Sequence, residues 1–390
     1  MNDFQLCSKK VMYITETKYP NSDAMSVRMH MIAKALIEMG NTVDIYSRGQ
    51  KNENSLNEAL PFTSLCTQKQ GKITKLIDYY IYFKKKIIKN IKEKKPDIVL
   101  VYYTPTSVLK KLIKLQKKYG FVLMHDCVEW YSKEQFYPSL YSKLAYCKRE
   151  KWMRKLLPEN AGIIAISRYL ESYFLKCKNR CMYIPAICDT QAISFEKDTN
   201  EDKIEIVYAG APGKKDYFRE IIYALKMLNP QEKEKITLRV IGATPQRIAQ
   251  DAQVSEKEVE ELGEVLQFLP RMSHQEVLKY LAKADFTILI RPVHLRYAQA
   301  GFPTKVPESL ATGTPVICNL TSDLGRYLQN GKNALIVESC RAESVCEALR
   351  KALKMSFAER QQMYDNARKT AEQFFDYRLY KQELNSFINN

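Results

Sequence analysis

The sequence predicts an α/β protein made of two doubly wound domains, each a parallel sheet covered by helices. Short apolar runs of strand length alternate with helical patterns along the chain. This series begins with a strand at Lys10–Thr15 and begins again with a strand at Ile204–Tyr208. The stretch Asp189–Asp202 between them is polar and charged, so we expect the interdomain linker there. A length of 390 residues is sufficient for two separate cores.

The composition is that of a globular protein without a disulfide or zinc framework. Hydrophobic residues make up 45% of the chain. The first residues lack the long apolar segment of a signal peptide, and runs such as Ala161–Ile166 are too short to span a bilayer. The ten cysteines include no C-x-x-C pair, and the four histidines are scattered. We therefore expect reduced cysteines, no metal site and a cytoplasmic protein.

Positive charge is concentrated in the N-terminal half. Residues 1–190 hold 33 of the 61 Lys and Arg but only 17 of the 44 Asp and Glu, so nearly all of the net charge of +17 lies there. Such a surface fits an anionic membrane or a nucleic acid, and it is also compatible with a solvated face that has no partner. The basic stretches contain no recognisable base-reading module, so we expect no nucleic-acid partner.

The stretch Lys72–Lys95 predicts the most distinctive helix of this half. Its apolar residues share one helical face, aromatic side chains lie among them, and nine lysines flank that face. This pattern is typical of a helix that lies on an acidic membrane. It is equally typical of a helix that packs on a sheet and keeps its lysines in water. Lysines between residues 110 and 118 predict a second basic helix.

A polar cluster follows the strand predicted at Phe121–Met124, and it begins with His125 and Asp126. Ligands of doubly wound sheets bind at the carboxyl ends of the strands. We therefore expect catalytic roles: His125 would hydrogen-bond a ligand, and Asp126 or Glu129 would orient or deprotonate a hydroxyl. The alternative is a structural loop in which Asp126 caps a helix.

The C-terminal half predicts an anion site at its first strand. Ile204–Tyr208 leads into a glycine loop that contains Gly210 and Lys215 and precedes a helix. That order brings free backbone N–H groups and positive charge to one place. His274 lies in a capping-box sequence further along, and we expect it to be structural.

A second stretch of this half, residues 300–319, AGFPTKVPESLATGTPVICN, predicts a loop, a short helix and a strand. It follows an apolar strand that ends in Arg291. Gly301 permits a left-handed or closely approached backbone in the loop. Glu308 falls in the first turn of the short helix, where free N–H groups and a carboxylate suit a polyol or phosphate ligand.

This stretch resembles the donor-site signature of family 4 glycosyltransferases, which have the two-domain GT-B fold. The positions that match are Gly301–Phe302, Glu308, Ala311, Gly313 and Pro315-Val316-Ile317. The resemblance implies that Glu308 holds the ribose of the nucleotide. It also implies that Lys215 reaches the donor diphosphate and that His125 lies beside the transferred sugar.

Two positions depart from the family pattern. Ala300 stands where the family has its first glutamate, which contacts the donor sugar, and Ala211 stands where the glycine loop has an arginine. Arg291 is expected to supply the missing charge. The residues assigned to the donor site are Gly210, Lys215, Arg291, Gly301, Phe302, Thr304, Lys305, Glu308 and Ser309, and those assigned to catalysis are His125 and Asp126.

The resemblance implies a nucleotide-sugar-dependent glycosyltransferase of the retaining type that needs no metal or other cofactor. We expect a saccharide or lipid-linked acceptor in surface polysaccharide synthesis, reached from the inner face of the membrane. The expected domains, facing across a cleft, are a basic acceptor domain (residues 1–190) and a donor domain (203–370), followed by a crossing C-terminal helix (371–390). The alternatives are a sugar-nucleotide epimerase of the same fold and a non-catalytic binding subunit.

Overall fold

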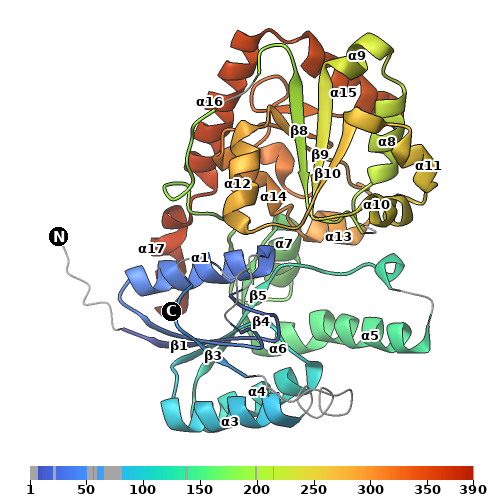
Figure 1. Cartoon of the computed structure of the whole chain (residues 1–390). Coiled ribbons are helices and arrows are strands. Elements are labelled where there is room, and N and C mark those ends of the chain that lie inside the picture. Colours follow the sequence, from blue (N-terminus) through green and yellow to red (C-terminus); the bar gives the residue numbers. More distant parts are fainter. Residues whose placement is uncertain are drawn as a thin grey trace, which may run out of the picture. The chain divides into compact units, whose positions relative to one another are not determined.

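The chain forms two compact units, and its last residues belong to the same unit as its first residues (Figure 1). The computed structural model describes residues 8–20, 23–50, 56, 59–65, 81–136, 139–197, 200–213 and 215–389. The first unit comprises Met1–Pro185 and Tyr377–Asn390, and the second comprises Ala186–Asp376.

The first unit contains a seven-stranded parallel sheet with the strand order β3-β2-β1-β4-β5-β6-β7. The strands are β1 (Lys10–Thr15), β2 (Thr42–Ser47), β3 (Phe62–Ser64), β4 (Ile98–Tyr103), β5 (Val122–Cys127), β6 (Gly162–Ala165) and β7 (Cys181–Tyr183). They are almost continuously apolar because both faces of a parallel sheet are covered. The order changes direction between β1 and β4, which is where doubly wound sheets bind ligands.

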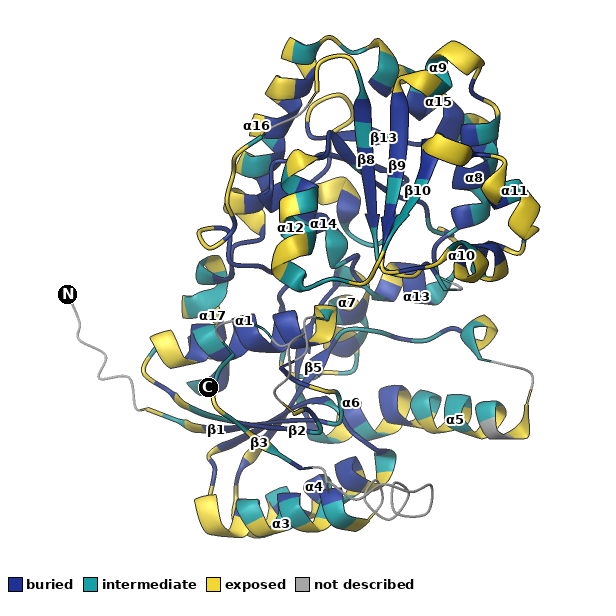
Figure 2. Cartoon of the chain, in the orientation of Figure 1, coloured by how far each residue is buried: buried dark blue, intermediate teal, exposed yellow. Residues whose placement is uncertain are grey.

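Helices cover both faces of this sheet, with α1 on one face and α3 and α4 on the other (Figure 1). The helices are α1 (Ala24–Glu38), α3 (Phe83–Lys94), α4 (Thr106–Tyr119), α5 (Leu140–Lys151), α6 (Leu157–Asn160) and α7 (Arg168–Lys176), with short turns η2 (Lys133–Gln135), η3 (Trp152–Leu156) and η6 (Tyr377–Tyr380). Asp23 caps α1 by accepting a hydrogen bond from the backbone of Ser26. Figure 2 shows the strands buried and the helices exposed on their outer sides.

The last helix, α17 (Lys381–Asn389), packs on the first unit. Lys381 forms an ion pair with Glu38 of α1 at 3.1 Å. Asn385 accepts a hydrogen bond from Asn41, just after α1. This is the crossing C-terminal helix that the family resemblance implies.

The second unit contains a six-stranded parallel sheet with the order β10-β9-β8-β11-β12-β13. The strands are β8 (Ile204–Ala209), β9 (Ile236–Ile241), β10 (Leu266–Leu269), β11 (Phe286–Leu289), β12 (Val316–Cys318) and β13 (Ala334–Ile336). The change of direction lies between β8 and β11. The loops that leave these two strands therefore meet at one edge of the sheet.

The helices of the second unit lie around this sheet (Figure 1). They are α8 (Phe218–Lys226), α9 (Pro230–Glu234), α10 (Pro245–Ala252), α11 (Glu256–Glu260), α12 (His274–Lys283), α13 (Arg296–Ala300), α14 (Lys305–Ala311), α15 (Ala342–Lys354) and α16 (Phe357–Phe374), with turns η4 (Gly263–Val265) and η5 (Leu324–Arg326). Ser273 and Glu276 form the expected capping box at the start of α12.

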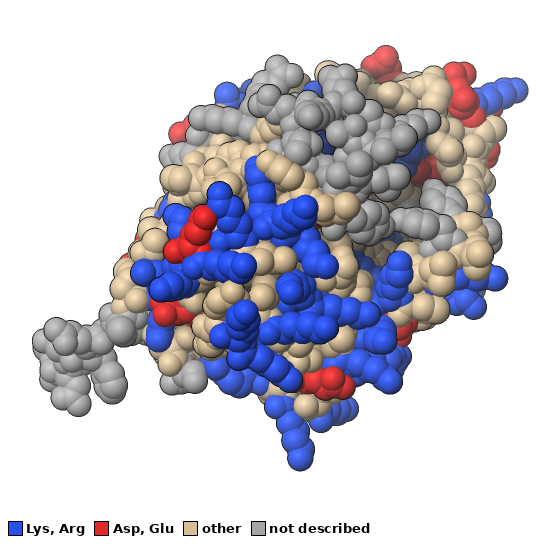
Figure 3. All heavy atoms as spheres, turned by 90° about the horizontal axis from the view of Figure 1, so that it is seen from below, with Lys and Arg blue, Asp and Glu red and all other residues tan. Residues whose placement is uncertain are grey.

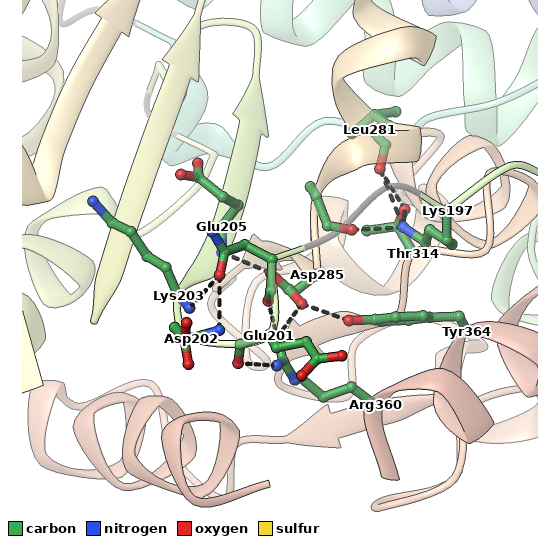
Figure 4. A network of polar contacts seen from close by, with 12 residues as sticks. Lys197, Glu201, Asp202, Lys203, Glu205, Leu281, Asp285, Thr314, Arg360 and Tyr364 are labelled. Atoms are coloured by element: carbon green, nitrogen blue, oxygen red, sulfur yellow. Dashed lines mark hydrogen bonds and ion pairs between the residues drawn. The ribbon is translucent and has the colours of Figure 1, made fainter. Parts of the chain in front are cut away.

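The segment expected to be a linker is instead packed into the second unit. Asp189 and Thr190 at its start are buried, whereas most of its other described polar residues are exposed. Lys197 donates hydrogen bonds to the carbonyl oxygens of Leu281 and Ala284 and to the hydroxyl of Thr314 at 2.6 Å (Figure 4). Burial lowers the pKa of Lys197 to about 7. The chain thus passes between the units at Pro185–Ala186 and at Asp376–Tyr377, rather than within Asp189–Asp202 and at residue 371.

A buried ion pair holds the end of this segment against α16. Asp285 and Arg360 lie 2.6 Å apart, and their side chains are 0% and 1% exposed. Arg360 also donates to the carbonyl oxygens of Asn200 and Glu201, and Tyr364 donates to Asp285 (Figure 4). The pair therefore connects the start of β8, the start of β11 and α16.

Replacing Asp285 by alanine should destabilise the second unit strongly. The change leaves the Arg360 guanidinium buried without its carboxylate, which costs about 3–5 kcal/mol. Urea unfolding followed by circular dichroism measures the loss. Arg247→Ala is the control: it removes a half-exposed arginine paired with Asp251, which keeps a hydrogen bond from the backbone of Gly213, and it should leave the midpoint nearly unchanged. Equal midpoints for Asp285→Ala and Arg247→Ala would contradict this account.

Candidate functional site

The two residues assigned to catalysis in the first unit do not share a site. Strand β5 continues to Cys127, three residues beyond the strand end expected at Met124, so His125 and Asp126 lie inside the strand. Successive side chains of a strand point to opposite faces. The structure therefore gives His125 and Asp126 separate surroundings on opposite faces of the sheet.

Asp126 is part of a buried structural ion pair. It is 0% exposed and pairs with Arg28 of α1 at 2.8 Å, and Tyr13 of β1 donates a hydrogen bond to its other oxygen. Arg28 also donates to the carbonyl oxygen of Pro185 at 2.6 Å. Because these donors occupy both carboxylate oxygens, Asp126 is not open to an acceptor hydroxyl. An arginine inside the apolar pattern of α1 was the sequence signal for a buried carboxylate.

His125 faces the other side of the sheet and is buried. Its ring meets that of Trp152 edge to face, with the ring centroids 5.0 Å apart. Burial lowers the pKa of His125 to about 3, so the imidazole is neutral near pH 7. Within the described part of the chain, neither ring nitrogen has a hydrogen-bond partner. His125 is therefore unsuited to proton transfer near neutral pH, and both of its ring nitrogens are buried in this structure.

In the second unit, three residues from separate segments meet at the carboxyl ends of β8 and β11. The loop after β8 turns at Gly210, whose φ of 101° favours glycine. Its far end is tied to β11 because Tyr217 donates a backbone hydrogen bond to Ile290. Asp216 consequently lies beside Arg291, and Lys305 reaches both from the first turn of α14.

Asp216 is the centre of this cluster. Its carboxylate accepts hydrogen bonds from Arg291 at 2.6 Å and from Tyr208 at 2.5 Å, and it lies 3.6 Å from Lys305. The Lys305 ammonium also sits over the Tyr208 ring, 3.9 Å from its centroid. The sequence reasoning missed Asp216, although an acidic residue directly after Lys215 was a visible signal.

The charges of the cluster do not cancel. Burial would raise the pKa of Asp216, but Arg291 and Lys305 lower it further than burial raises it. Burial lowers the pKa of Lys305 to about 8, against the opposing effect of Asp216. With two cations and one carboxylate, the cluster keeps a net positive charge near pH 7, which suits an anion.

Lys215 is less central than expected. Its backbone carbonyl accepts a hydrogen bond from Tyr297, which fixes the loop rather than the side chain. Its neighbour Lys214 lies outside the described residues. Lys305, which approaches Gly210 and Asp216, is the lysine that the structure brings to the cluster.

Glu308 lies one turn along α14 from Lys305. Its Oε1 atom is 2.8 Å from Nε2 of His274, the first residue of α12. Burial would lower the pKa of His274, but Glu308 raises it above the usual value. His274 was expected to be structural, and the structure instead places it against the main site carboxylate. Tyr208, Lys305 and Glu308 line one small hollow with a cavity volume of about 30 Å³.

Four other residues assigned to the donor site have different surroundings. Phe302 is 5% exposed and packs on Tyr327 and Phe375 in the core. The Ser309 hydroxyl hydrogen-bonds Thr287 and the carbonyl oxygen of Thr314, so it is buried and occupied. These two corrections share a cause: each side chain points away from the edge of the sheet.

Gly301 and Thr304 contribute backbone rather than side chains. Gly301 has a φ of −84° and an extended backbone, so of the two possibilities that glycine permits there, the left-handed one is not adopted. Thr304 precedes α14 and makes no capping hydrogen bond with its side chain. Ala300, at the position where the family has its first glutamate, is fully buried.

A third feature is the basic face of the first unit, formed by the exposed lysines of α3, α4 and the residue after α3. Figure 3 shows lysine and arginine side chains gathered there, with few carboxylates among them. The apolar side of α3 is not available to a membrane, because Phe83, Ile87 and Ile91 are buried. Residues 72–80 of the expected basic helix lie outside the described residues. The lysines are Lys85, Lys89, Lys92, Lys94, Lys95, Lys110, Lys114, Lys117 and Lys118.

The described residues contain neither a metal-binding cluster nor a membrane-spanning helix. Among the described residues, no three or more His, Cys, Asp and Glu side chains are grouped so that they could hold a metal ion. Over the same residues, no helix has the length and apolar character needed to cross a membrane.

Comparison with solved structures shows the same fold in several proteins. HepE from Anabaena, solved with UDP and glucose, has a TM-score of 0.72 at 15% identity over 98% of this chain and 99% of that chain. Sucrose-phosphate synthase from Thermosynechococcus elongatus has a TM-score of 0.73 at 15% identity over 98% of each chain. WaaG, a glycosyltransferase involved in lipopolysaccharide biosynthesis, has a TM-score of 0.66 at 17% identity over 97% of this chain and 100% of that chain.

Each half of the chain matches a glycosyltransferase family model. No curated protein matches the chain significantly by sequence. The model of glycosyl transferases group 1 matches residues 189–370, and that of glycosyltransferase family 4 matches residues 25–192. Together they cover nearly all of both parallel sheets. The chain therefore belongs to the group 1 and family 4 glycosyltransferases and has their GT-B fold.

Proposed function

We propose that this glycosyltransferase takes its sugar from a nucleoside diphosphate donor bound in the second unit. The observation that carries the proposal is that Arg291, Lys305 and Glu308 gather at the switch point of the parallel sheet. A diphosphate needs positive charge, and a ribose needs a carboxylate that accepts from vicinal hydroxyls. Arg291 and Lys305 supply the positive charge, and Glu308 lines one hollow together with Lys305.

The proposed chemistry rests on charge and positioning. When the bond from the sugar to the diphosphate breaks, negative charge grows on the leaving phosphate. Arg291 and Lys305 stabilise that charge more in the transition state than in the bound donor, and this lowers the barrier. We propose that these cations do so without a metal ion. His125 would contact the sugar as a neutral hydrogen-bonding group, and the reaction would proceed with retention.

The acceptor side is proposed from the charge of the first unit. Its basic face suits an acidic membrane, so the acceptor would be a saccharide or a lipid-linked saccharide in surface polysaccharide synthesis. The enzyme would work at the inner membrane face as a peripheral protein. Because the apolar side of α3 is buried in the unit, the contact would be electrostatic and would not involve insertion of this helix.

A ligand screen tests the donor proposal. Thermal shift with uridine, guanosine, adenosine and cytidine diphosphates and their sugars should single out one nucleotide, since a ligand that binds the native state raises its stability. HepE is seen with UDP-glucose, so a uridine donor is the first to test. The wild-type protein should slowly hydrolyse the matching sugar donor. An epimerase would convert that donor to another sugar nucleotide, and a binding subunit would leave it intact.

Glu308→Gln should weaken binding of that donor tenfold or more without unfolding the protein. It removes a charge-assisted hydrogen bond worth roughly 1.5–3 kcal/mol. Isothermal titration measures the change. Glu234→Gln, at an exposed position on α9, is the matched control and should bind as the wild type does. Unchanged affinity in Glu308→Gln would remove this residue from the site.

Diphosphate binding should weaken as the pH rises through about 8. The pKa of Lys305 is about 8, so the ammonium that attracts the phosphates is present below this pH and is lost above it. Titration of the selected nucleoside diphosphate between pH 7.5 and 9.5 measures the effect. Lys305→Arg keeps its charge over this range and should flatten the profile. Identical profiles for the two proteins would assign the pH dependence to another group.

Sedimentation with lipid vesicles tests the membrane face. The wild-type protein should bind anionic but not neutral vesicles, and added salt should weaken binding. Glutamine at Lys85, Lys92, Lys114 and Lys118 should abolish it while donor hydrolysis continues. The matched control replaces four exposed lysines of the second unit: Lys235, Lys257, Lys332 and Lys351. If the wild-type protein ignores anionic vesicles at low salt, a soluble acceptor becomes the better proposal.

A further inference from the structure

The contact between His274 and Glu308 joins two helices at the donor hollow. Nε2 of His274 lies 2.8 Å from Oε1 of Glu308, and the two side chains are 23% and 19% exposed. The contact brings the start of α12 to the first turn of α14. The Glu308 carboxylate on α14 is therefore held by a residue of another helix, His274 of α12.

Neither helix needs this contact for its own structure. The start of α12 is already capped, because Ser273 accepts from the backbone of Glu276, whose carboxylate accepts from the backbone of Ser273. Helix α14 is fixed to the sheet by Ser309, which hydrogen-bonds Thr287 of β11. The His274 imidazole is thus not needed to cap α12 or to fix α14, and its contact is with the Glu308 side chain.

The geometry leaves one face of the carboxylate free. In the described structure Glu308 takes its only side-chain hydrogen bond at Oε1, from His274. A carboxylate has about four acceptor positions, so Oε2 and the remaining position on Oε1 can accept two vicinal hydroxyls. A glutamate side chain that is already held loses less conformational freedom when it binds a ligand.

We propose that His274 is a positioning residue that holds Glu308 in the orientation in which it accepts the two ribose hydroxyls. This inference rests on the proposed donor site. The raised pKa of His274 is consistent with it, because the charge of Glu308 favours the protonated imidazole and makes the contact an ion pair. His274 itself does not touch the nucleotide in this account.

The test uses the full chain and the nucleoside diphosphate that gives the largest thermal shift among the uridine, guanosine, adenosine and cytidine compounds. Its partner probe is the 2′,3′-dideoxy form, which lacks both hydroxyls. His274→Phe keeps a packed ring without the N–H donor. His274→Gln keeps an N–H donor at similar reach. Gln275→Ala, at the next and exposed position of α12, is the control.

His274→Phe should bind the ribonucleotide about fivefold more weakly, the effect of one lost hydrogen bond. Its affinity for the dideoxy form should equal that of the wild type. His274→Gln should recover most of the ribonucleotide affinity, and Gln275→Ala should match the wild type. A purely structural role would instead weaken both probes equally and would not be rescued by glutamine.

Three results would overturn the inference. Equal weakening of both probes in His274→Phe, or no weakening of either, would do so while leaving the donor proposal intact. Failure of all four nucleoside diphosphates to bind the wild-type protein would overturn the donor proposal and this inference together.

Discussion

The donor-side arrangement depends on one buried carboxylate. Asp216 accepts hydrogen bonds from Tyr208 and Arg291 and lies close to Lys305, so a strand, a strand end and a helix start are connected at one point. Without it, two partly buried cations would lie close together with no compensating charge, and their repulsion would be unfavourable. With it, both cations are held at fixed positions before any ligand arrives. A preorganised cluster needs little rearrangement when charge develops on a leaving group.

The second constraint is the order of the parallel sheet. Because β8 and β11 are neighbours, the glycine loop after β8 and the segment after β11 leave the sheet at the same edge. The Asp216 cluster and Glu308 occupy that edge, and the core lies behind it. Side chains of the same signature that point inward, such as Phe302 and Ser309, hold the edge in place. A motif defined by sequence thus divides into residues that face the hollow and residues that support it.

The first unit uses a buried ion pair differently. Arg28 and Asp126 join α1 to β5 and to the last residue of the unit, Pro185, with no opening to a ligand. On the outside of the same unit, α3 combines a buried apolar side with exposed lysines. The excess positive charge of the N-terminal half therefore lies on exposed lysines at the surface, whereas the buried charges of Arg28 and Asp126 pair with each other. This separation allows a strongly basic unit to keep an ordinary apolar core.

Sequence alone determined the fold class, most strands, the crossing final helix and the family, because apolar periodicity and signature spacing are local properties. It also indicated Gly210, Arg291, Lys305 and Glu308, which the structure places around the same edge. Only the tertiary structure decided which charges meet. Asp216, His274 and Arg28 acquire their roles from partners between 34 and 98 residues away. Whether a polar side chain lies in a hollow or against a buried partner depends on where its strand ends and on which face of the sheet it points from. Strand β5 shows this, because it ends at Cys127, three residues beyond the expected end, and therefore includes His125 and Asp126. Such pairings follow from long-range packing, which local patterns do not encode.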